Sequence, residues 1–95
     1  MEIVQKAVAG TLESSDIMIR VSPSDELDIV INSTVEAQFG DEILKTVKEI
    51  LSKLNIDKIK ILIDDKGALD CVLRARLITA LIRSTKDQTL WEKIQ

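Results

Sequence analysis

The sequence predicts a small α+β domain, in which two helices pack on one face of a mostly antiparallel sheet of three to four strands. Short stretches of alternating apolar and polar residues indicate strands, and two longer stretches with apolar residues at a helical period indicate helices. These stretches follow one another in the order β-β-β-α-β-α. The chain of 95 residues is long enough for one compact domain, residues 1–95, and too short for two.

The first third of the chain predicts three strands. Alternation is weak over residues 3–9, which we take as a short extended segment, and residues 10–15 follow as a loop or tight connection. Residues 17–21 and 27–32 then alternate as half-buried strands do. Between them, residues 22–26 (SPSDE) have the composition of a turn, because proline fixes φ while Ser and Asp side chains bond nearby backbone groups. We therefore expect these two strands to form a hairpin.

The segment after the third strand predicts an amphipathic helix. Ser33 and Glu36 have the spacing of a capping box, in which each side chain bonds a backbone N–H at the helix start. Gly40 interrupts the helix at a cost of about 1 kcal/mol relative to alanine. Asn55 is suited to a left-handed cap at the helix end. The apolar residues of one face are Val35, Phe39, Ile43, Leu44, Val47, Ile50, Leu51 and Leu54.

A fourth strand and a second helix complete the predicted fold. Residues 58–64 alternate, and Asp64 or Asp65 in the following turn is placed to cap the next helix. That helix, about residues 68–83, has apolar residues nearly all around its axis, so either the domain wraps it or a partner chain completes its burial. Its two apolar sides are Leu69, Leu73, Leu77, Ala80 and Leu81, and Cys71, Ala75, Ile78 and Ile82.

Composition and charge argue against nucleic acid as a partner. The net charge is −3, whereas binding to phosphates needs clustered Lys and Arg. Only Phe39 and Trp91 are aromatic, so stacking platforms for bases are missing and the core must be aliphatic. Trp91 belongs to residues 85–95, which we expect to form a polar tail or a short extra helix. There it either anchors a partner surface or covers the domain's own edge.

We expect the protein to work in the cytoplasm. Cys71 is its one cysteine, so no intramolecular disulfide forms and a reducing compartment suits the chain. The start of the sequence, MEIVQK, lacks the basic region and apolar stretch of a signal peptide. No apolar run approaches the roughly 20 residues of a membrane helix, so we expect no membrane association.

The residue types that build an independent active site are scarce, and we expect no catalytic residue and no metal site. The chain has no histidine, which is the commonest general base and transition-metal ligand, and one cysteine cannot build a zinc site. Asp64 and Asp65 are candidates for paired carboxylates in Mg²⁺ binding or acid–base chemistry. An Asp at a strand end before Gly67 is more often part of a turn and a cap, which we favour.

Charged and polar residues of the second helix have structural interpretations of their own. Cys71 lies in an apolar helix without a base nearby in sequence, which indicates a buried, unreactive thiol. Asp70 and Arg74 have the i,i+4 spacing of a stabilising ion pair. Arg76 and Arg83 lie on one strip of the helix, where they either bind a phosphate-bearing ligand or an acidic partner, or lay their stems along the core with their heads in water. We favour the second alternative.

Ser14 and Ser15 stand beside Asp16 in a segment with the composition of a turn. A serine hydroxyl without a base is a poor nucleophile. It is nevertheless a good point of attachment, because a separate enzyme can supply the activation. Attachment requires an exposed hydroxyl on accessible backbone, and a loop that Gly10 introduces between strands meets that requirement.

Four segments resemble one known family in the same order along the chain. They are residues 7–16 (AVAGTLESSD), 35–40 (VEAQFG), 64–71 (DDKGALDC) and 72–77 (VLRARL). Together they resemble the acyl carrier protein of citrate lyase, its gamma chain. The likeness covers nearly the whole chain and is least diagnostic after Arg83.

The resemblance implies a non-catalytic carrier subunit in a lyase complex. The first serine of the pair, Ser14 here, would hold a phosphoribosyl-dephospho-CoA prosthetic group through a phosphodiester, added by a prosthetic-group transferase. The thiol of this group is acetylated in the family. The alpha chain, an acyl transferase, exchanges acetate for citrate, and the beta chain, a citryl lyase, cleaves the citryl thioester to oxaloacetate and regenerates the acetyl thioester.

The residues around Ser14 depart from the motif of ordinary acyl carrier proteins. Ordinary acyl carrier proteins are four-helix bundles with Asp-Ser-Leu at a helix start, whereas residues 13–16 (ESSD) precede a strand here. We therefore do not expect the four-helix acyl carrier fold. Three alternatives stay open: the acyl carrier subunit of malonate decarboxylase, an interaction module that docks through residues 68–83, and a free-standing enzyme using Asp64 and Asp65.

Overall fold

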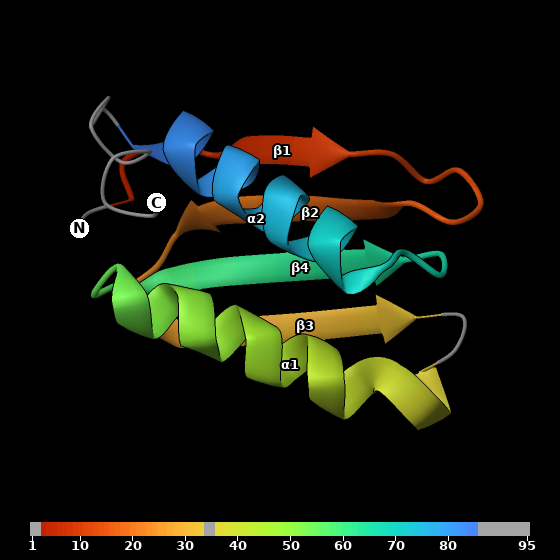
Figure 1. The fold of residues 1–95 in the computed structure, drawn as a ribbon. Coiled ribbons are helices and arrows are strands. Elements are labelled where there is room, and N and C mark those ends of the chain that lie inside the picture. The colour runs from red at the N-terminus through yellow and green to blue at the C-terminus, as the bar shows by residue number, and fades with distance from the viewer. Residues whose placement is uncertain (1–2, 34–35, 86–95) are drawn as a thin grey trace.

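The structure is a computed structural model that describes residues 3–33 and 36–85, with the backbone alone for residues 36–40. The described residues form strands and helices in the predicted order β-β-β-α-β-α (Figure 1). The elements are β1 (Ala7–Gly10), β2 (Ile17–Pro23), β3 (Leu27–Ser33), α1 (Glu36–Lys53), β4 (Ile59–Asp65) and α2 (Asp70–Ser84).

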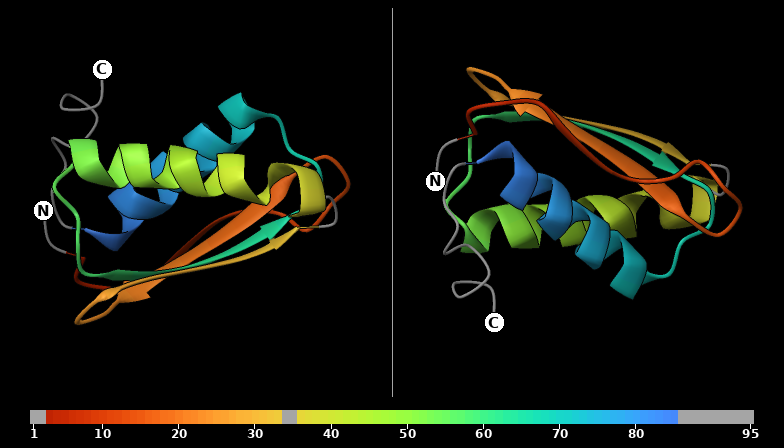
Figure 2. Two further views of the ribbon diagram at one scale, coloured as in Figure 1. Left: turned by 90° about the horizontal axis from the view of Figure 1, so that it is seen from below. Right: turned by 90° about the horizontal axis from the view of Figure 1, so that it is seen from above.

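The strands form one sheet in the order β1-β2-β4-β3, and both helices cover the same face of it. The two views of Figure 2 show these two layers from the side, and no helix of the described residues covers the other face of the sheet. β1 with β2 and β2 with β4 are antiparallel, while β3 and β4 are parallel. The predicted α+β class and the absence of a four-helix bundle are thus confirmed.

The predicted hairpin between residues 17–21 and 27–32 is wrong. β4 lies between β2 and β3 and pairs with both, from Ile17 opposite Asp65 to Pro23 opposite Ile59 on one side. The side chains of β4 that point toward the helices are fully buried, which suits the centre of a sheet. The three residues between β2 and β3 reach across the roughly 10 Å that two strand spacings require. The hairpin of this fold is instead β1–β2.

The core between the sheet and the helices is aliphatic, as the composition predicts. The central strands contribute alternate residues, and each helix contributes one face. Fully buried side chains include Ile17, Ile19 and Val21 of β2, Ile59, Ile61 and Ile63 of β4, Val47 of α1, and Leu77 and Leu81 of α2.

The first helix follows its predicted pattern where its side chains are described, except at Leu44, which is only half-buried. Ile43, Val47, Ile50 and Leu51 are buried against the sheet. Asn55 has a φ of 54°, so the predicted left-handed end of the helix is confirmed. The capping box stays a prediction, because residues 34–35 and the side chain of Glu36 lie outside the described part. Ser33 is the last residue of β3, and its hydroxyl donates to Asp65 Oδ2 at 2.8 Å.

The second helix buries one face only, so of the two alternatives, burial of the whole helix by the domain is excluded for the described residues. Its buried residues are Leu73, Leu77, Ala80, Leu81 and Ser84. Cys71 and Ala75 are exposed, and Leu69, which precedes the helix, is 71% exposed. The buried thiol that we expected at Cys71 is therefore wrong as well. The physical reason is that the sheet and α1 cover one side of α2, while no described element covers the other.

The prediction that Asp64 or Asp65 caps the second helix is also wrong. The helix begins at Asp70 after Leu69, which makes no side-chain cap. Asp65 Oδ1 instead accepts the N–H groups of Gly67 and Ala68, at 3.1 and 3.0 Å. These are the bonds that an N-cap residue makes, but here they close a turn before the helix starts. The predicted tail with Trp91 lies outside the described residues. Neither described helix has the length and apolar character to cross a bilayer.

Candidate functional site

The loop of residues 11–16 joins β1 to β2 at one end of the sheet. Figure 1 shows that the connection from β4 to α2 lies at the same end. Two backbone hydrogen bonds hold the two loops together: the Ser15 N–H donates to the Lys66 carbonyl at 2.8 Å, and the Lys66 N–H donates to the Asp16 carbonyl at 2.9 Å. The base of the loop is therefore fixed to the rest of the domain.

Gly10 makes the sharp start of this loop sterically allowed. Its φ is +93°, and a Cβ at this position would lie 1.8 Å from the Ile17 carbonyl oxygen. Only glycine fits such a close approach of two backbone segments. The Thr11 N–H then donates to the same Ile17 carbonyl at 3.2 Å, which closes the hairpin.

Asp16 organises the base of the loop with its carboxylate. Oδ2 accepts the Thr11 hydroxyl at 2.6 Å, and Oδ1 accepts the Ile17 N–H at 2.7 Å. Arg76 on α2 donates from Nε and Nη2 to the same carboxylate, at 3.3 and 3.2 Å. The Thr11 hydroxyl, then the Ile17 N–H and Arg76, hold the pKa of Asp16 below its ordinary value of 3.8. The group is thus an ionised anchor at neutral pH.

Ser14 occupies the corner of the loop. The Asp16 N–H donates to the Glu13 carbonyl at 3.1 Å, so residues 13–16 form a β-turn with the two serines in its centre. Ser15 has a φ of 66°, in the left-handed region that the third position of some turns requires. Ser14 is exposed, and no described residue hydrogen-bonds its hydroxyl. The turn that we expected from the sequence and the exposure that attachment requires are both present.

The paired carboxylates of β4 do not form an acid–base pair. Asp65 is 3% exposed, and Ser33, Gly67 and Ala68 all donate to it. Adjacent residues of a strand point to opposite faces of the sheet. Asp64 accordingly pairs with Arg20, at 3.8 Å, on the open face. Within the described residues, no group of His, Cys, Asp and Glu side chains could hold a metal ion.

Only one of the three arginines in the second helix reaches the Ser14 loop. Arg74 pairs with Asp70 at 2.7 Å, as the i,i+4 spacing predicts. Arg83 donates from Nη1 to the Val8 carbonyl at 2.8 Å. Arg76 reaches Asp16, two residues from Ser14. The sequence does not reveal this pair, because 60 residues separate its members and no local pattern links them.

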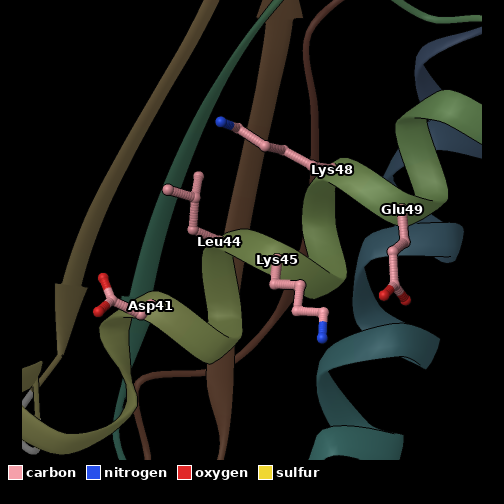
Figure 3. A pocket seen from close by; sticks show the side chains of 5 residues that line it. All are labelled: Asp41, Leu44, Lys45, Lys48 and Glu49. Carbon is pink, nitrogen blue, oxygen red and sulfur yellow. The ribbon is translucent and has the colours of Figure 1, made fainter.

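A depression on the outer side of α1 is a weaker candidate for a site. Figure 3 shows its side chains, which all come from one helix and point in different directions. No set of polar groups converges there, so the depression does not have the geometry of a catalytic site. Its lining residues are Asp41, Leu44, Lys45, Lys48 and Glu49.

The comparison with protein families and the comparison with individual relatives both find acyl carrier proteins. Residues 4–84 match the acyl carrier family described as the malonate decarboxylase delta subunit. The citrate lyase acyl carrier proteins of Haemophilus ducreyi and of Haemophilus influenzae strain PittEE are 55% and 54% identical over 94 residues, which is 99% of this chain and 99% of each relative.

A solved structure shows the same fold. It is a chain of a Pseudomonas malonate decarboxylase hetero-tetramer in complex with malonate, with a TM-score of 0.64 and 17% sequence identity. The match covers 90% of this chain and 93% of that one. The sheet and its helical layer are therefore shared by the two chains. A sequence identity this low is evidence for the fold alone.

Proposed function

Because the chain belongs to the citrate lyase acyl carrier protein family, we propose that it serves as the acyl carrier subunit of a citrate lyase and that Ser14 holds its prosthetic group. The family resemblance selects Ser14, and one structural observation supports it as the point of attachment. Its exposed hydroxyl stands at the corner of a turn whose base is fixed by Asp16, Arg76 and the bonds to Lys66. A carrier needs this combination, because the arm must be reachable while its anchor stays in place.

The surroundings of Ser14 suit a phosphodiester to phosphoribosyl-dephospho-CoA. Lys66, on the loop that pairs with the Ser14 loop, is exposed and brings a positive charge to this end of the sheet. The N-terminus of α2 lies at the same end, and the free N–H groups of a helix start favour anions. When bound, the group would supply a thiol that carries the acyl unit as a thioester.

The chemistry of the reaction would belong to other chains. No described residue contacts the Ser14 hydroxyl as a base, so its modification needs a separate prosthetic-group transferase. The alpha chain as acyl transferase and the beta chain as citryl lyase would then act on the tethered acyl group. Tethering raises its effective concentration at both active sites. The exposed thiol of Cys71 suits a reducing compartment, and we place this work in the cytoplasm.

The carrier subunit of malonate decarboxylase is the second candidate, since the matching family bears that name. Sequence identity separates the two. It is 55% to a citrate lyase carrier over the full chain, against 17% to the solved malonate decarboxylase chain. The citrate lyase assignment is therefore the better supported one. Reconstitution with the catalytic chains of each complex distinguishes them by which substrate is turned over.

Mass spectrometry tests the attachment site. The chain is produced together with its modifying enzymes, and its intact mass and proteolytic peptides are measured for the parent, Ser14→Ala and Ser15→Ala. We expect a CoA-type adduct on the peptide with Ser14 in the parent and in Ser15→Ala, and none in Ser14→Ala. Ser15→Ala is a matched control because it removes the neighbouring hydroxyl from the same turn. An adduct that survives in Ser14→Ala would refute the assignment.

A further inference from the structure

The face of the sheet that points away from the helices carries a row of partly apolar side chains. Val8, Arg20, Leu62 and Val30 are cross-strand neighbours in register, one from each strand. Val8 is 45% and Val30 39% exposed, and Leu62 is half-buried. A sheet face that only meets water is usually polar. Val8, Leu62 and Val30 therefore place apolar area on a face where polar side chains are expected.

Positively charged side chains help to line a hollow at this face. Residues of β1, β2 and β4 line it, among them the apolar Val8 and Leu62. Lys6, Arg20 and Lys60 line the hollow, and no carboxylate does. Arg20 is partly compensated by Asp64 at 3.8 Å, whereas Lys6 and Lys60 form no ion pair with a described residue. Asp28 is opposite Lys60 in register but does not pair with it.

This charge pattern contrasts with the whole chain, whose net charge is −3. A hollow lined by three cations and by apolar side chains favours a partner surface that combines carboxylates with apolar area. The outer face of α1 makes no such selection, since its Lys45 and Lys48 alternate with Asp41 and Glu49 (Figure 3). Of these two exposed areas, only the hollow on the open sheet face is lined by one sign of charge together with apolar area.

The open sheet face also suits docking because of its relation to Ser14. β1 and β2 form part of the hollow, and the loop between them carries Ser14 at one end of the sheet. A partner seated on the face would hold the strands from which the loop projects, without covering the loop itself.

We propose that the open sheet face, centred on Lys6, Arg20 and Lys60, is the surface through which the carrier docks on an acidic, apolar-centred surface of a catalytic chain of its complex. This inference rests on the proposed carrier function. It does not depend on Ser14 being modified, because the docking surface and the attachment loop are separate sets of residues.

The test measures binding of the full-length chain with the substitution Ser14→Ala, so that no prosthetic group is present. Its Kd for the purified catalytic chains is compared with that of two further variants made in the same background. Lys6→Glu with Lys60→Glu reverses two charges of the hollow, and Lys45→Glu with Lys48→Glu reverses two on the outer face of α1. We expect binding to weaken about tenfold or more in the first and to change little in the second.

Two further measurements keep the test decisive. Thermal unfolding checks that both variants are folded, and the milder pair Lys6→Gln with Lys60→Gln should give an intermediate loss of affinity. The affinity of the parent should also fall as salt is added. An equal Kd for the Ser14→Ala chain and the hollow variants would overturn the proposal. A larger loss of affinity in the α1 variant than in the hollow variants would overturn it as well. If the hollow variants lose self-association and keep partner binding, the face would be assigned to a second copy of the chain, which would also overturn the proposal. The mass-spectrometry experiment separates this proposal from the carrier function. An adduct on Ser14 there, together with unchanged binding of the hollow variants here, would support the carrier function and refute only the docking surface.

Discussion

The base and the tip of the β1–β2 loop differ in how firmly they are held. At the base, Gly10, Thr11 and Asp16 are fixed by backbone contacts, hydrogen bonds and the pair with Arg76. At the tip, the Ser14 hydroxyl is exposed and has no described hydrogen-bond partner. The same few residues thus combine a fixed anchor with a free functional group. A group tethered at Ser14 would move while its point of attachment keeps its place.

The largest effect is expected where the base is most crowded. Gly10→Ala places a Cβ 1.8 Å from a backbone oxygen, at a φ of +93°. Gly67→Ala is the matched control, because its φ is +94° and nothing lies within 4 Å of the added atom. We expect a loss of about 3 kcal/mol or more in the free energy of unfolding for Gly10→Ala, and about 1 kcal/mol for Gly67→Ala. Urea unfolding measures both, and equal losses would show that the close approach is absent.

The next largest loss of stability is expected at the end of β4, where the carboxylates of Asp64 and Asp65 are neighbours in sequence. Asp65 is buried and accepts three hydrogen bonds, so Asp65→Ala should cost about 3 kcal/mol. Asp64 makes one exposed ion pair at 3.8 Å, and Asp64→Ala should cost less than about 0.5 kcal/mol. The same unfolding experiment compares them. A catalytic role for the two as a pair would instead require both variants to fold normally and lose activity.

Arg76, which holds the Ser14 loop, and Arg74 on the same helix should differ in a smaller, local effect on amide hydrogen exchange. Arg76→Ala removes two hydrogen bonds to Asp16, whereas Arg74→Ala breaks pairs with Asp70 and Glu49 on the side of α1. We expect faster amide hydrogen exchange at Ser15 and Asp16 in Arg76→Ala only. The rate of prosthetic-group loading should fall in the same variant. Unchanged exchange in Arg76→Ala would mean that the backbone bonds to Lys66 hold the loop by themselves.

The smallest effect is on pH dependence. The Thr11 hydroxyl, the Ile17 N–H and Arg76 lower the pKa of Asp16 below 3.8 in the folded protein. A lowered pKa stabilises the fold at pH values above the ordinary one, and this contribution is lost as the pH falls through the folded-state pKa. Asp16→Asn does not titrate, so its stability should fall less than that of the parent between neutral pH and about pH 3. Parallel pH profiles for the two proteins would contradict this role of Asp16.

The sequence predicted the elements of the fold better than their pairing. Alternation in residues 17–21, 27–32 and 58–64 identified three strands, because that signal is local. It contains no information on which strands become neighbours, so the turn residues between β2 and β3 suggested a hairpin where β4 intervenes. The burial of Cys71 was wrong for a related reason. An apolar helix does not reveal which of its faces the rest of the domain leaves open.

The candidate site likewise has a part that the local sequence predicted and a part that depends on the folded structure. The local composition of residues 10–16 predicted a turn, and the family resemblance selected Ser14 within it. The pair of Asp16 with Arg76 depends on how α2 crosses the sheet, which no spacing along the chain encodes. Only the arrangement of the folded elements shows that the attachment loop has a fixed base.

Citrate cleavage by the reconstituted complex tests the central assignment most directly. The carrier chain is loaded by its modifying enzymes and combined with the catalytic chains, as the parent, as Ser14→Ala and as Ser15→Ala, each with its folding checked by thermal unfolding. We predict that Ser14→Ala is folded and inactive, while Ser15→Ala keeps most of the parent's activity. A folded Ser14→Ala chain that still supports turnover of citrate would contradict the account.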